Sequence, residues 1–341
     1  MENLMVLFFG ILFGIVVQYA RVNRTDVITG TTVLDEFTVA KVLALAVGTA
    51  AIIIDMEIAM GVATYHVKPL VLGGVVWGGI VFGAGIAILG YCPGTMPISA
   101  GQGSMDAAFG IIGGLLGGLV YPLVHPFIEP ALGPNFGDIT MHSILGDHKL
   151  ALHLFTLAFG ALAIGTAFAV DRRQKSIDRR WVVTGLGLAI LNAIIMLDVV
   201  SNRPIGASTS YPFLADVIAS ATDNEYFRSI HVPGQWEMVF LCGAFISGLG
   251  VSLWKKEFKI QIVHSRWAQY MGDSTAKRII WSLVGGFILI FGARMAGGCT
   301  SGHILSGGMQ LAMSSLIFAA FVFISLILTG KLFYSNARRR K

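Results

Sequence analysis

Long apolar stretches constrain this chain more than any other feature of its sequence. The runs lie at roughly residues 3–20, 38–61, 69–90, 105–124, 150–170, 181–200, 236–254, 279–296 and 311–333. Each is close to the length that a helix needs to cross a bilayer, and helices satisfy their own backbone polar groups in lipid. Only 13% of the residues are charged, against about a quarter in soluble domains. We therefore expect an all-α, polytopic helical membrane protein with nine spans.

The positions of the basic residues predict its orientation. Lys and Arg are concentrated in residues 171–180, in residues 255–278 and in the tail 335–341, whereas residues 125–147 contain none. Cytoplasmic loops carry the excess of Lys and Arg, so the C-terminus is expected in the cytoplasm and, with nine spans, the N-terminus outside. This distribution accounts for the net charge of +5, and no nucleic-acid partner is expected.

Metal, cofactor and disulfide chemistry are not expected. Cys92, Cys242 and Cys299 lie in or beside predicted spans, away from an oxidising aqueous face. The histidines of the outer region match no metal-binding spacing.

A repeat becomes visible when the sequence is shifted by 207 residues. Both halves then read GG-x5-G-x4-G-x-C-x6-S-x-G, with Cys92 over Cys299 and Ser99 over Ser306. One span, 150–170, connects the halves, and an odd connector inverts the second half relative to the first. We therefore divide the chain into a first repeat (1–124), an outer loop with the connecting span (125–180), and a second repeat with the basic tail (181–341). Interrupted segments at matching positions of inverted repeats indicate a transport site.

The interruptions are YCPGTMPISAGQG (91–103) and GGCTSGHILSGG (297–308). Their prolines and glycines do not favour a continuous span, and irregular backbone at membrane depth is tolerated where it lines a cavity. Free N–H groups at helix starts attract anions, hydroxyls add neutral donors, and thiols suit a solute with exposed sulfur. The candidate site residues are Cys92, Gly94, Thr95, Ser99, Cys299, Thr300, Ser301, Gly302, His303 and Ser306.

Two residues near these segments, Arg294 and His303, each have two interpretations. Arg294 either attracts an anion or pairs structurally with Asp198, Asp55 or Glu57. His303 either donates to an anion or relays a proton, or else it has a packing or backbone-bonding role. Asp106 is expected to cap the fourth span.

The segments GARMAGGCTSGHILSGG (292–308), GYCPGTMPISAGQG (90–103) and FGIVVQYAR (13–21) resemble the YeeE/YedE family of bacterial sulfur-compound transporters. The resemblance implies an inner-membrane protein with four additional short re-entrant helices, near 22–36, 91–103, 203–222 and 298–309. It implies thiosulfate uptake along a central path of cysteines that includes Cys92 and Cys299. A third path cysteine of the family is replaced here by Asn23, within ARVNRTD.

We therefore predict a transporter, not an enzyme, that takes up a small sulfur oxyanion, most simply thiosulfate. The expected partners are this anion, the lipid bilayer and a cytoplasmic sulfur-carrier protein. Three alternatives stay open: a membrane sulfurtransferase that forms a cysteine persulfide, a transporter of another sulfur or selenium species, and a neutral-solute channel or structural subunit. The sequence shows no nucleotide-binding loop and no soluble catalytic module.

Overall fold

The computed structural model describes residues 2–146, 148–174, 177–221 and 224–335, so most of the basic tail, 336–341, lies outside the described residues. The described part is helical, and its only β-type pairings are isolated bridges. Its long helices are α1 (Glu2–Tyr19), α3 (Thr38–Ala59), α4 (Leu72–Leu89), α6 (Met105–Leu132), α8 (Lys149–Gln174), α9 (Arg180–Met196), α11 (Glu225–Trp254), α13 (Thr275–Met295) and α14 (Met313–Phe333). Its short helices are α2 (Thr25–Thr32), α5 (Met96–Gly101), α7 (Met141–Leu145), α10 (Ser210–Ala219), α12 (Ser265–Met271) and the π-type helix η1 (Thr300–Gly307).

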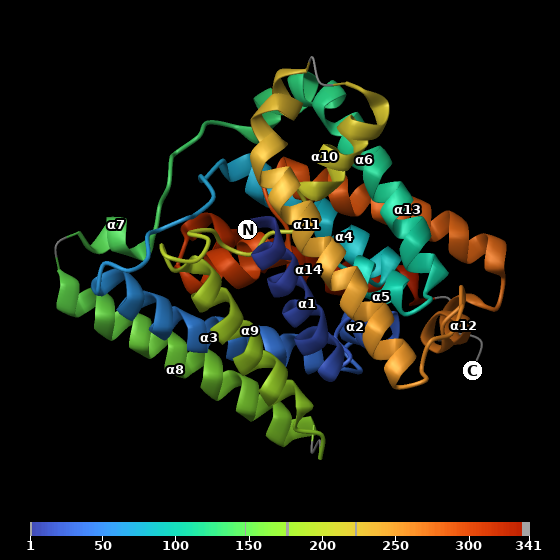
Figure 1. The fold of residues 1–341 in the computed structure, drawn as a ribbon, viewed down its shortest axis with the longest axis horizontal. Coiled ribbons are helices and arrows are strands. Elements are labelled where there is room, and N and C mark those ends of the chain that lie inside the picture. The colour runs from blue at the N-terminus through green and yellow to red at the C-terminus, as the bar shows by residue number, and fades with distance from the viewer. Residues whose placement is uncertain (1, 147, 175–176, 222–223, 336–341) are drawn as a thin grey trace.

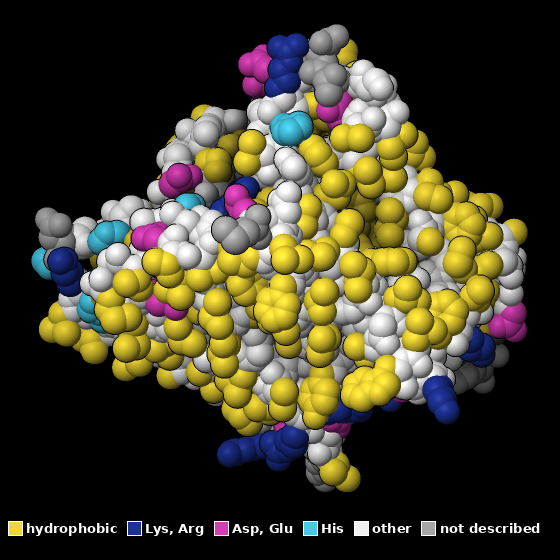
Figure 2. Space-filling view, viewed as in Figure 1, with side chains coloured by type: hydrophobic (Ala, Val, Ile, Leu, Met, Phe, Trp, Pro, Cys, Tyr) yellow, Lys and Arg dark blue, Asp and Glu magenta, His cyan; other side chains and the backbone are white. Residues whose placement is uncertain are grey.

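The helices confirm the expected all-α membrane protein. Within the described residues, eight helices are long and apolar enough to cross a membrane, and α9 is a shorter apolar helix of 17 residues. Figure 2 shows hydrophobic side chains over the middle of one face, with most charged side chains at its margins. Such an apolar belt matches a protein surrounded by lipid.

Two helices extend beyond the predicted spans. The fourth span was expected to end near residue 124, but α6 continues to Leu132 through Pro122, Pro126 and Pro130. The seventh was expected from 236, but α11 begins at Glu225 and continues through Pro233. Prolines mark helix ends in water, whereas neighbouring helices allow them inside membrane helices. The predicted boundaries are therefore wrong at these two places, because both helices continue through prolines that were expected to end them.

The centre of the bundle is a close crossing of α4 and α13 (Figure 1). A Cβ on Gly78 would lie 2.9 Å from the Ala296 Cβ, and a Cβ on Gly285 would lie 2.9 Å from the Leu89 Cβ. Only glycine therefore allows this separation of the two helices. Around the crossing, α4 packs on α14, α13 on α6, and α1 on α11.

The outlying helix α8 packs mainly on α3, and Figure 1 shows the two side by side. The four segments that the resemblance marks as re-entrant each contain a short helix: α2, α5, α10 and η1. Their entry into the membrane from one face, and return to it, stays a prediction.

Candidate functional site

Three cavities are lined by polar side chains of the two interrupted segments. The Lys68 cavity, of about 390 Å³, is lined by Lys68, Arg203, Cys299 and Gly302 among others. The central cavity, of about 100 Å³, is lined by Cys92, Gly94, Thr95, Thr300 and Ser301 together with apolar side chains. The Gln102 cavity, of about 490 Å³, is lined by Arg24, Gln102, Ser104, Gln261 and His264 among others. Neighbours in the sequence line successive cavities: Cys299 the first, Thr300 and Ser301 the second.

The Lys68 cavity is lined by two basic side chains, Lys68 and Arg203, and by one carboxylate, Glu237. Lys68 precedes α4, and Arg203 lies in the connection between α9 and α10. Burial lowers the pKa of Lys68, and the carboxylate of Glu237 partly opposes this shift. Glu237 accepts hydrogen bonds from the backbone N–H groups of Thr209, at 2.6 Å, and Ser210, at 3.3 Å. The start of α10 is therefore occupied by a carboxylate of the protein itself, and this carboxylate lines the same cavity as the two cations.

Each thiol is hydrogen-bonded to a hydroxyl. The Cys299 sulfur lies 3.2 Å from the Ser301 Oγ, and the Cys92 sulfur lies 3.3 Å from the Thr95 Oγ1. Both thiols lie within electrostatic range of each other and of Tyr211. The Tyr211 hydroxyl donates to the carbonyl of Pro93 at 2.8 Å and so ties α10 to the segment that carries Cys92. The two halves of the repeat thus bring their cysteines together.

Thr300 lines the central cavity and carries an unused polar atom. Its Oγ1 is buried and has no hydrogen-bond partner among the described residues. A hydroxyl that makes no internal hydrogen bond can donate to a solute that comes within reach of it.

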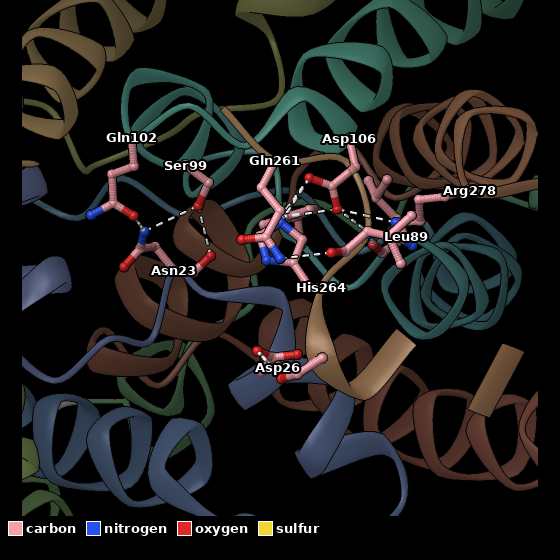
Figure 3. Close-up of polar contacts among 12 residues, drawn as sticks. Asn23, Asp26, Leu89, Ser99, Gln102, Asp106, Gln261, His264 and Arg278 are labelled. Atoms are coloured by element: carbon pink, nitrogen blue, oxygen red, sulfur yellow. Dashed lines mark hydrogen bonds and ion pairs between the residues drawn. The ribbon is translucent and has the colours of Figure 1, made fainter. Parts of the chain in front are cut away.

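Asn23 and Ser99 lie beyond the central cavity, fully buried (Figure 3). The Asn23 amide donates to Ser99 Oγ at 3.0 Å and to Gln102 Oε1 at 2.8 Å. Ser99 Oγ in turn donates to the Asn23 carbonyl at 2.8 Å. The corresponding Ser306 in the second half donates to the carbonyl of Ile205 at 2.9 Å. Ser99 therefore ties α5 to the connection before α2. Ser306 in the same way ties η1 to the connection before α10.

The expectation for Arg294 as a partner of Asp198, Asp55 or Glu57 is wrong. Its guanidinium is buried and donates to the Tyr226 hydroxyl at 2.6 Å and to Thr209 Oγ1 at 3.1 Å. The extension of α11 to Glu225 brings Tyr226 to it. Arg294 therefore lies behind the wall of the Lys68 cavity, within electrostatic range of Lys68.

His303 is fully buried beside the thiol segment. Its ring nitrogens bond to Ser315 Oγ at 3.0 Å and to the carbonyl of Ala296 at 2.8 Å. The ring also stacks on Phe318. These contacts favour the packing and backbone-bonding reading over proton relay.

Asp106 does not cap the fourth span, because Ser104 holds the capping position of α6. The Asp106 carboxylate accepts hydrogen bonds from Arg278 Nε, at 3.1 Å, and Arg278 Nη2, at 2.5 Å. Tyr91 donates to the same carboxylate at 3.1 Å, and His264 Nε2 lies 3.1 Å from it (Figure 3). This buried cluster fastens α13 and the connection after α11 to the segment that carries Cys92.

Sequence analysis did not name several residues of the site as candidates: Lys68, Arg203, Glu237, Tyr211, Gln18 and Gln102. Lys68 and Arg203 had a usable signal, since each is a lone cation at the end of a span opposite the basic loops. Among the described residues, no group of three or more His, Cys, Asp and Glu side chains is placed to hold a metal ion.

The fold and the cavities define a polytopic membrane protein whose interior offers cations, hydroxyls and thiols to a small solute. The chain belongs to the Sulphur transport family, whose family model matches residues 20–328. It is similar to the thiosulfate transporter TsuA of Spirochaeta thermophila, with 24% identity over 92% of this chain and 93% of that one. A phospho-N-acetylmuramoyl-pentapeptide-transferase of Desulfosudis oleivorans is 26% identical over only 43% of this chain and 45% of its own.

The family membership agrees with the resemblance found in the sequence. The protein is a multi-pass membrane transporter of a sulfur compound and not an enzyme, and its partners are a small anionic substrate and the lipid bilayer.

Proposed function

We propose that this protein takes up thiosulfate across the cell inner membrane, from the Lys68 cavity past Cys299, the central cavity and Cys92 to the Gln102 cavity. The observation that carries the proposal is the pair of thiols beside the central cavity, each hydrogen-bonded to a hydroxyl. The similarity to a thiosulfate transporter over nearly the whole chain supports the choice of ion.

The orientation follows from the basic segments, which adjoin the Gln102 cavity through Lys259 and the residues around it. We place this cavity and the C-terminus in the cytoplasm, and the N-terminus and the Lys68 cavity outside. An anion would then be collected where Lys68 and Arg203 outnumber Glu237. It would be released where Asp26 and Glu257 balance Arg24 and Lys259. A cytoplasmic sulfur-carrier protein that takes the ion from this cavity is part of the proposal.

An inverted repeat is supported by the central crossing. Adding 207 to Gly78 and Leu89 gives Gly285 and Ala296, so the Gly78–Ala296 contact corresponds to the Gly285–Leu89 contact. The same shift relates the Gly85–Leu289 contact to the Gly292–Phe82 contact. Such reciprocal contacts are those expected around a pseudo-twofold axis between α4 and α13.

The thiols would act by hydrogen bonding, with no bond to sulfur made or broken. A thiol can donate S–H to an oxygen or to the terminal sulfur of thiosulfate, and it can turn back to its own hydroxyl partner when the ion leaves. The oxygens of the ion would be met by Thr95, Thr300 and Ser301, which line the same cavity. Binding sites that are neutral and several in number allow the ion to leave as well as to enter.

Uptake of labelled thiosulfate into liposomes that contain the purified protein tests the proposal. We expect saturable uptake that unlabelled thiosulfate blocks and that an equal concentration of sulfate reduces only weakly. Selenite and sulfite in the same assay distinguish transporters of other sulfur or selenium species. Equal competition by sulfate and thiosulfate would contradict the assignment of thiosulfate.

Lys68→Met is expected to raise the KM for uptake about 10-fold or more, because a charged hydrogen bond contributes about 1.5–3 kcal/mol. Lys68 attracts the ion only when protonated. Since its pKa is lowered, the KM of the unaltered protein should rise with pH, and this rise should begin below the ordinary lysine value of 10.5. The variant should lose this pH dependence.

The matched control is Lys277→Met, which removes an exposed lysine at the start of α13. Its KM and pH profile should equal those of the unaltered protein. A pH profile that is unchanged in Lys68→Met would show that this amine takes no part in binding.

A further inference from the structure

Three polar side chains, Asn23, Ser99 and Gln102, separate the central cavity from the Gln102 cavity. Val22 lines the first cavity and Arg24 the second, so Asn23 lies between the two. Along α5, Thr95 lines the first cavity and Gln102 the second, and Ser99 lies one helical turn from Thr95. Asn23 and Ser99 are buried and line neither cavity.

The direction of every hydrogen bond in this group is fixed from one end. The carbonyl of Gly14 can only accept, so Gln18 presents its Nε2 to it at 2.9 Å. Gln18 Oε1 is then left for Gln102 Nε2, at 2.7 Å, and Gln102 Oε1 is left for Asn23 Nδ2, at 2.8 Å. Asn23 Nδ2 gives its second hydrogen to Ser99, whose own proton goes to the Asn23 carbonyl. Each side-chain donor of Asn23 and Ser99 is therefore used internally.

One acceptor is left over. Asn23 Oδ1 is buried and has no hydrogen-bond partner among the described residues. Figure 3 shows the Asn23 amide with its nitrogen toward Ser99 and Gln102. A lone carbonyl oxygen without an adjacent free donor repels an anion, because anions require N–H, O–H or S–H groups. In this arrangement the Asn23 carbonyl oxygen repels the ion that the two thiols attract.

We propose that the Asn23 amide closes the path to anions at the Gln102 cavity and that rotation of this amide opens it. The inference rests on the proposed function, because it takes the three cavities as one anion path. A half-turn about the Cβ–Cγ bond would present the NH₂ group to the ion and place Oδ1 against Gln102 Oε1. The lost hydrogen bonds favour the closed state, and a charge-assisted bond from the amide to the ion favours the open state. The ion itself therefore shifts the population toward passage.

The backbone around Gln102 is hydrogen-bonded to a neighbouring segment, so the proposed movement involves side chains alone. Lys259 and Gln261 donate their backbone N–H groups to the carbonyls of Gln102, at 3.3 Å, and Gly103, at 2.9 Å. The N–H of Met105 donates to the Gln261 carbonyl at 2.8 Å. The connection after α11 is thus hydrogen-bonded along the end of α5.

The rate at which Cys92 reacts with an anionic, membrane-impermeant methanethiosulfonate tests the inference without measuring transport. The protein carries Cys242→Ser and Cys299→Ser, so that Cys92 is its only thiol, and the reagent is added separately to each side of a liposome membrane. Asn23→Ala should accelerate the reaction from the Gln102 side at least 10-fold and leave the rate from the Lys68 side unchanged. Gln102→Ala keeps Asn23 but removes the oxygen that accepts a hydrogen bond from its amide, and it should accelerate the reaction several-fold. This second variant keeps the inference testable if Asn23→Ala does not fold.

The matched control is Gln310→Ala. Gln310 is a buried glutamine whose amide bonds to the backbone of His66 and Ser306 and not to Asn23. Its reaction rate from the Gln102 side should not change. Unaltered rates in both Asn23→Ala and Gln102→Ala would overturn the inference even if thiosulfate uptake is normal. Accelerated rates in a protein that does not take up thiosulfate would support closure of the path by the Asn23 amide. They would contradict the assignment of thiosulfate as the substrate.

Discussion

Cys299→Ala and Cys92→Ala are each expected to reduce thiosulfate uptake at least 10-fold. Each removes the only S–H group on its side of the central cavity and leaves the Ser301 or Thr95 hydroxyl without its sulfur partner. A loss of about 1.4 kcal/mol at one point of the path corresponds to 10-fold in rate. Labelled-thiosulfate uptake into liposomes, normalised to the amount of folded protein, measures the effect.

Serine at the same positions separates hydrogen bonding from sulfur chemistry. Cys299→Ser and Cys92→Ser keep a donor and should retain more uptake than the alanine variants. Cys242→Ala is the control, since Cys242 lies exposed on α11 and takes no part in the path. Normal uptake by both alanine variants would reject the thiol path, while leaving the family assignment intact.

Arg278→Met should destabilise the folded protein by about 3–5 kcal/mol, the usual cost of leaving a buried charge without its partner. Asp106 and Arg278 are both fully buried, and the guanidinium also donates to the Leu89 carbonyl at 2.8 Å and lies over the Trp267 ring. Thermal unfolding in detergent measures the change. The double variant Asp106→Leu/Arg278→Met should be more stable than Arg278→Met alone, because no unpaired charge remains.

Arg180→Met is the control for this prediction. Arg180 pairs with Asp178 in an exposed position, and their hydrogen bond lowers the pKa of Asp178 to about 2. Exposed pairs contribute about 0–1 kcal/mol, so this variant should unfold within a few degrees of the unaltered protein. Equal stability of the Arg278 and Arg180 variants would mean that the buried cluster does not hold the helices together.

The membrane spans could be predicted because apolar length is a strong and local signal. The ends of α6 and α11 could not, because their prolines are accommodated by neighbouring helices that no local pattern reveals. The cysteines and hydroxyls of the two interrupted segments stood out through their repetition, and the structure lines the central cavity with Cys92, Thr95, Thr300 and Ser301.

Pairings between distant residues were the weakest part of the sequence interpretation. Acidic partners were one of the two interpretations of Arg294, yet it donates to a tyrosine and a threonine. Asp106 suited a helix cap locally, but Arg278, 172 residues away, determines its role. Gln18 and Gln102 lie inside the quoted segments 13–21 and 90–103, but only their contact in three dimensions shows their importance.

The lining of the central cavity has a consequence for dehydration. Most of the side chains that line it are apolar, and Cys92, Thr95, Thr300 and Ser301 are among its few polar ones. An ion that passes Cys299 must therefore leave its hydration shell behind and accept a few hydroxyls and thiols in exchange. Sulfate, whose charge is held on four oxygens, binds its water tightly, whereas a terminal sulfur spreads charge and sheds water more readily. Much of the discrimination between the two ions would then arise in the solvent that each has to lose.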